Sequence, residues 1–132
     1  MLVFIAEDDA AMRALLALSL KKKGFSVDTA EDGQDLINKL SLARQQKVLP
    51  NLIISDVQMP NATGLDVLLW MNQWLPTVPT ILISAFGDRQ FHIRAQMLGA
   101  AAVFDKPLRF RALFERINEI LHRHVSDGSP LS

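Results

Sequence analysis

Residues 52–64, Leu52-Ile-Ile-Ser-Asp-Val-Gln-Met-Pro-Asn-Ala-Thr-Gly64, decide the fold. An apolar run of strand length ends in an acid, Asp56, and a loop containing proline and glycine follows it. From about Thr63 to Trp74 the spacing of apolar residues becomes helical. A strand, a loop and a helix in this order form the repeating unit of a parallel sheet with crossover helices. The stretch therefore predicts an α/β protein with Asp56 at the carboxyl end of a strand.

The same unit recurs on both sides of this stretch, and five strand and helix pairs are expected. The first helix follows the first strand and has an inner stripe of Met12, Leu15, Leu16 and Leu20. Regular alternation predicts a flavodoxin-like, doubly wound sheet of five parallel strands in the order 2-1-3-4-5, with five helices. The expected strands are 2–6, 25–30, 52–56, 80–84 and one within 99–105, and the later helices are 32–47, 63–74, 88–98 and one from Phe110 to Leu121.

The composition indicates one domain. With 132 residues, 49% of them hydrophobic, the chain can build one core, and we expect residues 1–125 to form it and residues 126–132 to be a tail or the start of a linker. Fourteen acidic and fourteen basic residues leave no global charge for binding nucleic acid or a membrane surface. The absence of cysteine excludes disulfides and thiolate chemistry. No signal peptide or membrane span is recognised, so we expect a cytoplasmic protein.

Polar side chains stand where four of the expected strands end. Because parallel strands all end at one edge of a sheet, and ligands bind there at the reversal of strand order, we expect these side chains to converge. Each alone is an ordinary feature: an acid after a strand is often a helix cap, as Asp9 is expected to be, and Ser or Lys at a strand end is often simply solvated. Their shared edge is what favours function. The residues are Glu7 and Asp8, Asp56, Ser84 and Lys106.

Three carboxylates at one point would raise one another's pKa values unless a cation neutralised them. Oxygen ligands without cysteine or a nearby histidine favour Mg²⁺, held by Glu7, Asp8 and Asp56. Asp56 can then act as a nucleophile on phosphorus. Lys106 begins about 10 Å away, two strand spacings from Asp56, and its side chain can span most of that gap. With the hydroxyl of Ser84, it would bind oxygens of a phosphorylated Asp56.

These motifs resemble the response-regulator receiver family over about residues 2–124. The resemblance implies that a histidine kinase or a phosphotransfer protein phosphorylates Asp56, that Glu7 and Asp8 form the metal-binding acid pair, and that the backbone carbonyl of Gln58 adds a ligand. It also implies a cis bond between Lys106 and Pro107. The stretches that carry the resemblance are Ile5-Ala-Glu-Asp-Asp9, Ile54 to Gly64, Ile83-Ser-Ala85 and Asp105-Lys-Pro107.

The resemblance also implies what the domain does with the phosphoryl group. Such a domain is a switch rather than an enzyme, since it catalyses its own phosphotransfer and slow self-dephosphorylation. An output domain or a downstream protein would detect the change, and a dimer would form through helix four, strand five and helix five, where Phe91, Ile93 and Met97 give helix four apolar residues on more than one side. Direct binding of nucleic acid is not expected.

At three positions the chain departs from the family pattern or carries a residue that would tune its reaction. The family has a switch aromatic three residues before the lysine, where this chain has Val103; Phe104 is adjacent, but strand alternation points it to the other side of the sheet. Positions two beyond the acceptor and two beyond the hydroxyl, Gln58 and Phe86, tend to tune hydrolysis in this family. With apolar Phe86 shielding the phosphoryl group, we expect slow self-dephosphorylation.

Three other functions share parts of this pattern. A pseudo-receiver would keep the acids but act as a docking module that is independent of phosphorylation. A phosphohydrolase with an aspartyl-phosphate intermediate needs a second acid two residues after the nucleophile, where this chain has Gln58. A flavin-binding module needs a phosphate-binding loop after the first strand, where Glu7, Asp8 and Asp9 would repel phosphate.

Overall fold

Five parallel strands form one sheet in the order β2-β1-β3-β4-β5. The computed structural model describes residues 1–85 and 88–128. Strands and helices alternate along the chain without exception, so the predicted doubly wound fold is confirmed. The strands are β1 (Leu2–Ala6), β2 (Ser26–Ala30), β3 (Leu52–Asp56), β4 (Thr80–Ser84) and β5 (Ala102–Asp105), and the helices are α1 (Ala10–Lys22), α2 (Gly33–Gln46), α3 (Gly64–Trp74), α4 (Arg89–Met97) and α5 (Phe110–Gly128).

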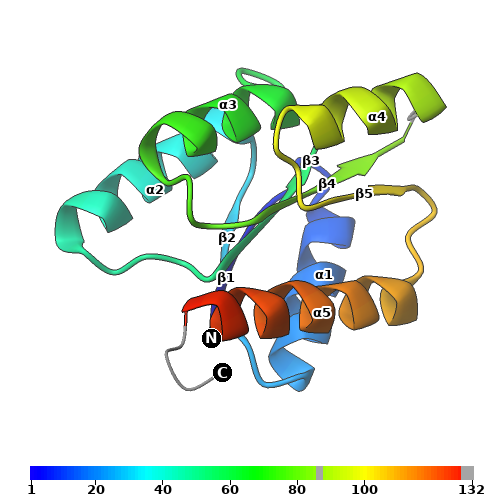
Figure 1. The fold of residues 1–132 in the computed structure, drawn as a ribbon. Coiled ribbons are helices and arrows are strands. Elements are labelled where there is room, and N and C mark those ends of the chain that lie inside the picture. Colours follow the sequence, from blue (N-terminus) through cyan, green and yellow to red (C-terminus); the bar gives the residue numbers. More distant parts are fainter. Residues whose placement is uncertain (86–87, 129–132) are drawn as a thin grey trace.

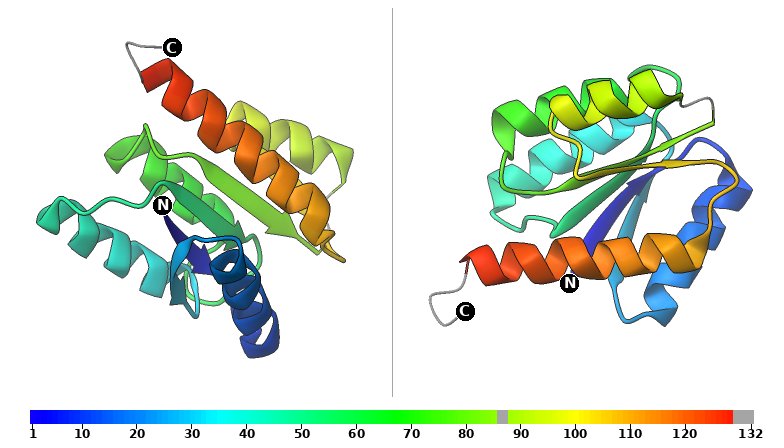
Figure 2. Two further views of the ribbon diagram at one scale, coloured as in Figure 1. Left: turned by 90° about the horizontal axis from the view of Figure 1, so that it is seen from below. Right: turned by 45° about the vertical axis from the view of Figure 1, so that its right-hand side comes forward.

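The helices form two layers, one on each face of the sheet. Helices α1 and α5 cover one face, and α2, α3 and α4 cover the other (Figure 1). Figure 2 shows the same two layers from two further directions. Strands β3 and β4 are buried along their whole length, as expected for apolar runs that are covered on both sides. The core therefore lies in two layers, one on each face of the sheet.

Short polar residues fix where the helices begin. Asp9 caps α1, Asp32 caps α2 and Asp88 caps α4, each by accepting hydrogen bonds from backbone N–H groups of the first turn. Thr63 and Asp66 form a reciprocal capping box at the start of α3. The sequence predicts that α2, α3 and α4 begin at Asp32, Thr63 and Asp88, and each begins one residue later, because the predicted first residue is the cap.

One member of the predicted inner stripe of α1 is wrong. Leu16 and Leu20 are fully buried, and Met12 packs against the same core, but Leu15 is 48% exposed. Successive residues on a helix are rotated by about 100°. A core face centred on Leu16 and Leu20 therefore leaves Leu15 on the outside, although it is as apolar as its neighbour.

The carboxyl-terminal helix extends further than its apolar pattern. Its core residues Leu113, Ile117, Ile120 and Leu121 pack against the sheet as predicted. The helix continues to Gly128, so the segment expected to be a tail begins inside α5, and residues 129–132 lie outside the described residues. The division into residues 1–125 and 126–132 stays a prediction. In the part of the chain that the structure describes, no helix is long and apolar enough to cross a membrane.

Candidate functional site

The expected site residues meet at the carboxyl edge of the sheet. Glu7 follows β1, Asp56 ends β3, Ser84 ends β4 and Lys106 follows β5. Glu7, Asp56 and Ser84 are 2%, 5% and 4% exposed, whereas Asp8 is exposed. The sheet thus brings an exposed acid and two buried ones to the same edge from strands that are far apart in the sequence.

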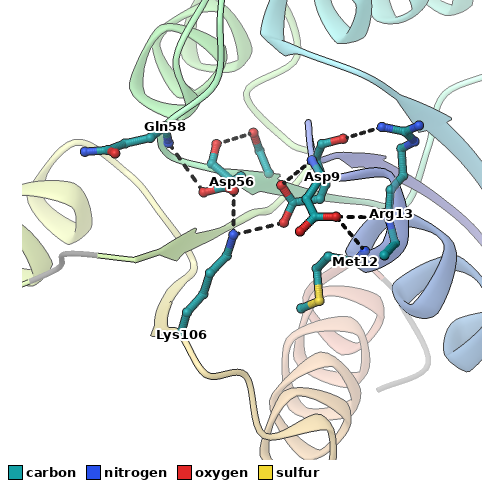
Figure 3. A network of polar contacts seen from close by, with 9 residues as sticks. Asp9, Met12, Arg13, Asp56, Gln58 and Lys106 are labelled. Carbon is teal, nitrogen blue, oxygen red and sulfur yellow. Dashed lines mark hydrogen bonds and ion pairs between the residues drawn. The ribbon is translucent and has the colours of Figure 1, made fainter.

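The three acids lie close enough together to share one ion. One carboxylate oxygen from each of Glu7, Asp8 and Asp56 lies within 4.8 Å of the other two. Lys106 contacts two of these acids: its Nζ atom is 2.7 Å from Oδ2 of Asp56 and 3.0 Å from Oε1 of Glu7. Figure 3 shows the lysine side chain reaching Asp56. The lysine side chain therefore does span the gap from β5 to β3, as its position in the sequence predicted.

Burial changes the acidity of these groups. Loss of hydration raises the pKa of Glu7 to about 7, and a hydrogen bond with Asp56 adds to this effect, while Lys106 opposes it. Burial by itself would lower the pKa of Lys106, but its bonds to Asp56 and Glu7 outweigh burial and raise that pKa above its ordinary value. Glu7 can therefore hold a proton near neutral pH when no metal is bound, and Lys106 stays charged.

Backbone groups and one arginine hold Glu7 in place. The Asp9 N–H donates to Oε2 of Glu7 at 3.3 Å, and Arg13 donates from Nη1 to the Glu7 carbonyl oxygen at 2.8 Å. The Glu7 N–H donates to the carbonyl oxygen of Ala30, at the end of β2. Asp9 itself caps α1, which is the structural role expected for it. Arg13 was not among the predicted residues, since an arginine in a helix gives no sign of which backbone carbonyl it will reach.

The loop after Asp56 turns directly over the acceptor. The Gln58 N–H lies 3.4 Å from Oδ1 of Asp56 (Figure 3), and the Val57 N–H donates to the Ile83 carbonyl of β4 at 2.9 Å. Gly64 is required at the end of this loop, because a Cβ atom there would lie 2.4 Å from the Asp56 carbonyl oxygen. The ligand role of the Gln58 carbonyl stays a prediction.

Strand β5 departs from the family pattern as the sequence indicated. Val103 packs with Leu82 and Ala95 on the face covered by α3 and α4, while Phe104 packs against the core beneath α1 and α5. The two side chains therefore point to opposite faces. The Lys106–Pro107 bond is cis, as the resemblance implied, and the Lys106 N–H donates to the Ser84 carbonyl at 2.8 Å.

An unexpected contact joins α4 to the end of β5. Nε2 of His92 lies 2.8 Å from Oδ1 of Asp105, and the His92 side chain is 28% exposed. Asp105 is the β5 neighbour of Ser84 in the sheet register.

The apolar residues expected on helix four differ in their exposure. On α4, Phe91 is partly buried while Ile93 and Met97 are 47% and 83% exposed. Phe86, the other position expected to tune hydrolysis, lies outside the described residues.

Comparisons with known proteins agree with this geometry. The chain is 30% identical over 92% of its length to the alkaline phosphatase synthesis transcriptional regulatory protein SphR of Synechococcus elongatus, and 29% identical over 98% to a CpxR homolog of Haemophilus influenzae. The match covers 49% and 54% of those relatives, so the chain spans about half their length.

The fold has solved counterparts. A CheY-like response regulator receiver domain protein of Methanospirillum hungatei superposes with a TM-score of 0.83 at 23% identity, over 96% of this chain and 97% of the other. The family model of the response regulator receiver domain matches residues 3–118 of this chain. The chain therefore belongs to the response regulator receiver domain family of two-component systems.

Proposed function

We propose that this receiver domain accepts a phosphoryl group on Asp56 from a histidine kinase or a phosphotransfer protein, in a reaction that requires Mg²⁺. The observation that carries the proposal is the convergence of three carboxylates within 4.8 Å and of Lys106 at 2.7 Å from Asp56. In the transfer, a carboxylate oxygen of Asp56 bonds to phosphorus as the bond between phosphorus and the donor's imidazole nitrogen breaks. That nitrogen keeps the electron pair, and the product is an acyl phosphate.

The acid cluster fits a magnesium ion. Two of its three carboxylates are almost fully buried, and the pKa of Glu7 is raised even though Lys106 contacts it. The single ammonium of Lys106 therefore does not offset the lost hydration of the cluster. Oxygen donors are the ligands that Mg²⁺ takes in proteins, usually with several waters. Glu7, Asp8, Asp56 and the Gln58 backbone carbonyl would hold the ion, which would neutralise charge on the phosphoryl oxygens.

Lys106 and Ser84 would bind the phosphoryl group from the other side. The Lys106 ammonium already contacts the carboxylate that would carry the phosphoryl group. Ser84 stands at the end of β4, between the strands that supply Asp56 and Lys106. Preorganised donors of this kind favour the transfer because they meet charge that develops in the transition state. The domain would thus catalyse its own phosphorylation and slow self-dephosphorylation, without turning over a separate substrate.

The phosphoryl group would be sensed through the surface of α4, β5 and α5. It adds nearly two negative charges next to strand ends that lead into α4 and α5. Exposed Ile93 and Met97 give α4 an apolar face, through which a dimer would form or a downstream protein would bind. Because the two curated relatives are named transcriptional regulatory proteins and are about twice as long, an output domain elsewhere in a longer protein would bind nucleic acid, rather than this charge-balanced domain.

The pseudo-receiver alternative gains no support from the site, since the acid pair, the acceptor and the lysine are all present and brought together. The second acid of a phosphohydrolase is also absent, as Gln58 occupies that position. A cytoplasmic location follows from the proposal, because the phosphodonors of this family act there.

Intact-mass analysis after incubation with Mg²⁺ and acetyl phosphate tests this function. We expect one acid-labile phosphoryl adduct on the native protein and none on Asp56→Asn. Asp28→Asn, a change of the same chemical type on the edge strand β2, is the matched control and should be labelled like the native protein. Equal labelling of Asp56→Asn, or no labelling of the native protein, would contradict the proposal.

A further inference from the structure

The loop that leaves the acceptor, residues 57–63, is fastened at its far end by α3. The Gly64 N–H donates to the Val57 carbonyl at 2.8 Å, which closes the loop on itself. Thr63 and Asp66 then cap α3, with Oδ2 of Asp66 accepting from the Thr63 N–H at 2.8 Å. These bonds fix where the loop ends, but they do not contact its middle.

A second attachment reaches the middle of the loop from α2. Asn61 donates from Nδ2 to Oδ2 of Asp32 at 2.7 Å, across 29 positions of sequence. The other oxygen of Asp32 accepts from the Asp35 N–H at 2.8 Å, so one carboxylate both caps α2 and binds the loop. These two bonds hold the pKa of the Asp32 carboxyl below its ordinary value, which keeps it ionised and strengthens both.

The backbone at this contact is adapted to it. Asn61 has a φ of 71°, a left-handed conformation that asparagine adopts more readily than most residues. Gly33, the first residue of α2, lies so close to the loop that a Cβ atom there would stand 2.1 Å from the Ala62 carbonyl oxygen. The loop therefore packs directly onto the first turn of α2, and α2 and α3 lie side by side (Figure 1).

The turn that supplies Asp32 also contacts the backbone of Glu7. The Ala30 carbonyl at the end of β2 accepts from the Glu7 N–H, and Glu31 alone separates Ala30 from Asp32. Residues 30–33 thus contact the backbone of one predicted metal ligand, Glu7, and the loop that carries another, Gln58. A shift of this turn would change the spacing between the two sides of the site.

We propose that Asp32 and Asn61 are positioning residues of the phosphoacceptor site, whose hydrogen bond sets the loop 57–63 and hence the Gln58 backbone at the correct distance from Glu7 and Asp56. This inference rests on the proposed function, because it concerns the same magnesium-dependent site. Neither residue contacts the acceptor, so both act through the loop.

Two substitutions remove the hydrogen bond and keep the rest of the contact. Asn61→Gly retains the left-handed backbone but lacks the amide donor. Asp32→Ser retains a side chain that can cap α2, but serine is too short to reach Asn61. The matched control is Ala43→Gly, which weakens the buried face of α2 far from the loop. It separates general loss of stability from loss of positioning.

Magnesium affinity, measured by calorimetry without phosphodonor, is the first readout. We expect the dissociation constant for Mg²⁺ to rise roughly threefold to tenfold in each single variant, as for one lost hydrogen bond. The double variant should bind as weakly as either single variant, because both remove the same bond. Native-like affinity in both single variants, or the same weakening in Ala43→Gly, would overturn the inference.

Amide hydrogen exchange without metal separates this inference from the proposed function. If the bond holds the middle of the loop, the Ala62 amide, which donates to the Pro60 carbonyl at 2.8 Å, should exchange faster in Asn61→Gly than in the native protein or Ala43→Gly. Unchanged exchange would show that the pair does not hold the loop. A native protein that bound no Mg²⁺ would contradict the proposed function, and the exchange rates would still decide whether Asp32 and Asn61 fix the loop.

Discussion

Nζ of Lys106 lies 2.7 Å from Oδ2 of Asp56, although 50 positions of sequence separate the two residues. The contact crosses β4, which lies between the strands that carry them. The same ammonium lies 3.0 Å from Glu7, so it binds two carboxylates that a divalent cation would also bind. Lysine and metal would therefore compete for the same two carboxylates, so removing the lysine should change the affinity for the metal.

Replacing Lys106 with methionine should have opposite effects on metal binding and on phosphorylation. Magnesium should bind more tightly, because a cation that competes for Glu7 and Asp56 is gone. Phosphorylation by acetyl phosphate should slow by about 10² or more, since charge on the phosphoryl oxygens loses its ammonium partner. Calorimetry and time-resolved intact-mass analysis measure the two effects.

Lys39→Met is the control for this pair of effects, because Lys39 also lies between two carboxylates, Asp28 and Asp35, but at the β2 edge of the molecule. It should change neither quantity. Weaker magnesium binding by Lys106→Met, or phosphorylation at the native rate, would show that the lysine does not act as described.

The stability of the metal-free protein should depend on pH through Glu7. Its pKa is raised from 4.5 to about 7, so between these values the folded state binds more protons than the unfolded state. The contribution of Glu7 to stability is therefore complete below about pH 4.5 and is lost as the pH rises through about 7. Glu7→Gln, which is neutral at every pH, should lack this loss.

Urea unfolding of both proteins with a chelator present, from pH 5 to pH 8, measures the difference. We expect the free energy of unfolding of Glu7→Gln to increase relative to the native protein as the pH rises. A difference that stays constant over this range would mean that Glu7 does not hold a proton in the folded protein. Magnesium affinity of the native protein should increase over the same range, because metal and proton compete for Glu7.

Replacing Gly64 or Gly24 with alanine should destabilise the protein in both cases, but only the change at Gly64 should affect the acceptor. Gly64→Ala would place a Cβ atom 2.4 Å from the Asp56 carbonyl oxygen, so it should cost about 1–3 kcal/mol or more and slow phosphorylation. Gly24→Ala meets no atom within 4 Å and is strained through its φ of 96°. It should cost about 1 kcal/mol and leave phosphorylation unchanged. Equal rates of phosphorylation in the two variants would contradict this account of the loop.

The site residues at the strand ends could be predicted, because their residue types and their positions after apolar runs both indicate one site. Asp56, Ser84 and Lys106 each end or follow an apolar run, and a parallel sheet places all such positions on one edge. The opposed directions of Val103 and Phe104 followed in the same way from strand alternation. These features depend on the spacing of apolar residues and on the order of strands and helices, and both can be read from the sequence.

Other features depend on tertiary contacts, which the spacing of apolar residues does not specify. Leu15 and Leu16 are equally apolar, and the packing of α1 against the sheet decides which of them is buried. His92 is partly covered and contacts Asp105, and this contact depends on how α4 packs beside β5. The hydrogen bond from Asn61 to Asp32 joins two turns whose sequences give no sign that they meet. The two turns lie close together in the fold, where Gly33 packs directly against Ala62.

The exposed apolar face of α4 should support association once the protein is phosphorylated. Met97 is 83% exposed, and placing a charge there would oppose burial in a dimer. Met97→Glu should therefore reduce the dimer fraction seen by sedimentation with Mg²⁺ and acetyl phosphate, with phosphorylation unchanged. Leu42→Glu, at a 52% exposed position on α2, should leave association unaffected. Loss of association in both variants would place the interface elsewhere.

The central claim is that one carboxylate, Asp56, receives the phosphoryl group. Borohydride reduction of the phosphorylated protein converts an aspartyl phosphate to homoserine, and peptide mass spectrometry then locates the changed residue. We expect homoserine at position 56 and nowhere else, in a sample that contained Mg²⁺. A reduced residue at Asp8, Asp9 or another acid, or a phosphoryl group that resists reduction because it is carried by serine or histidine, would contradict it.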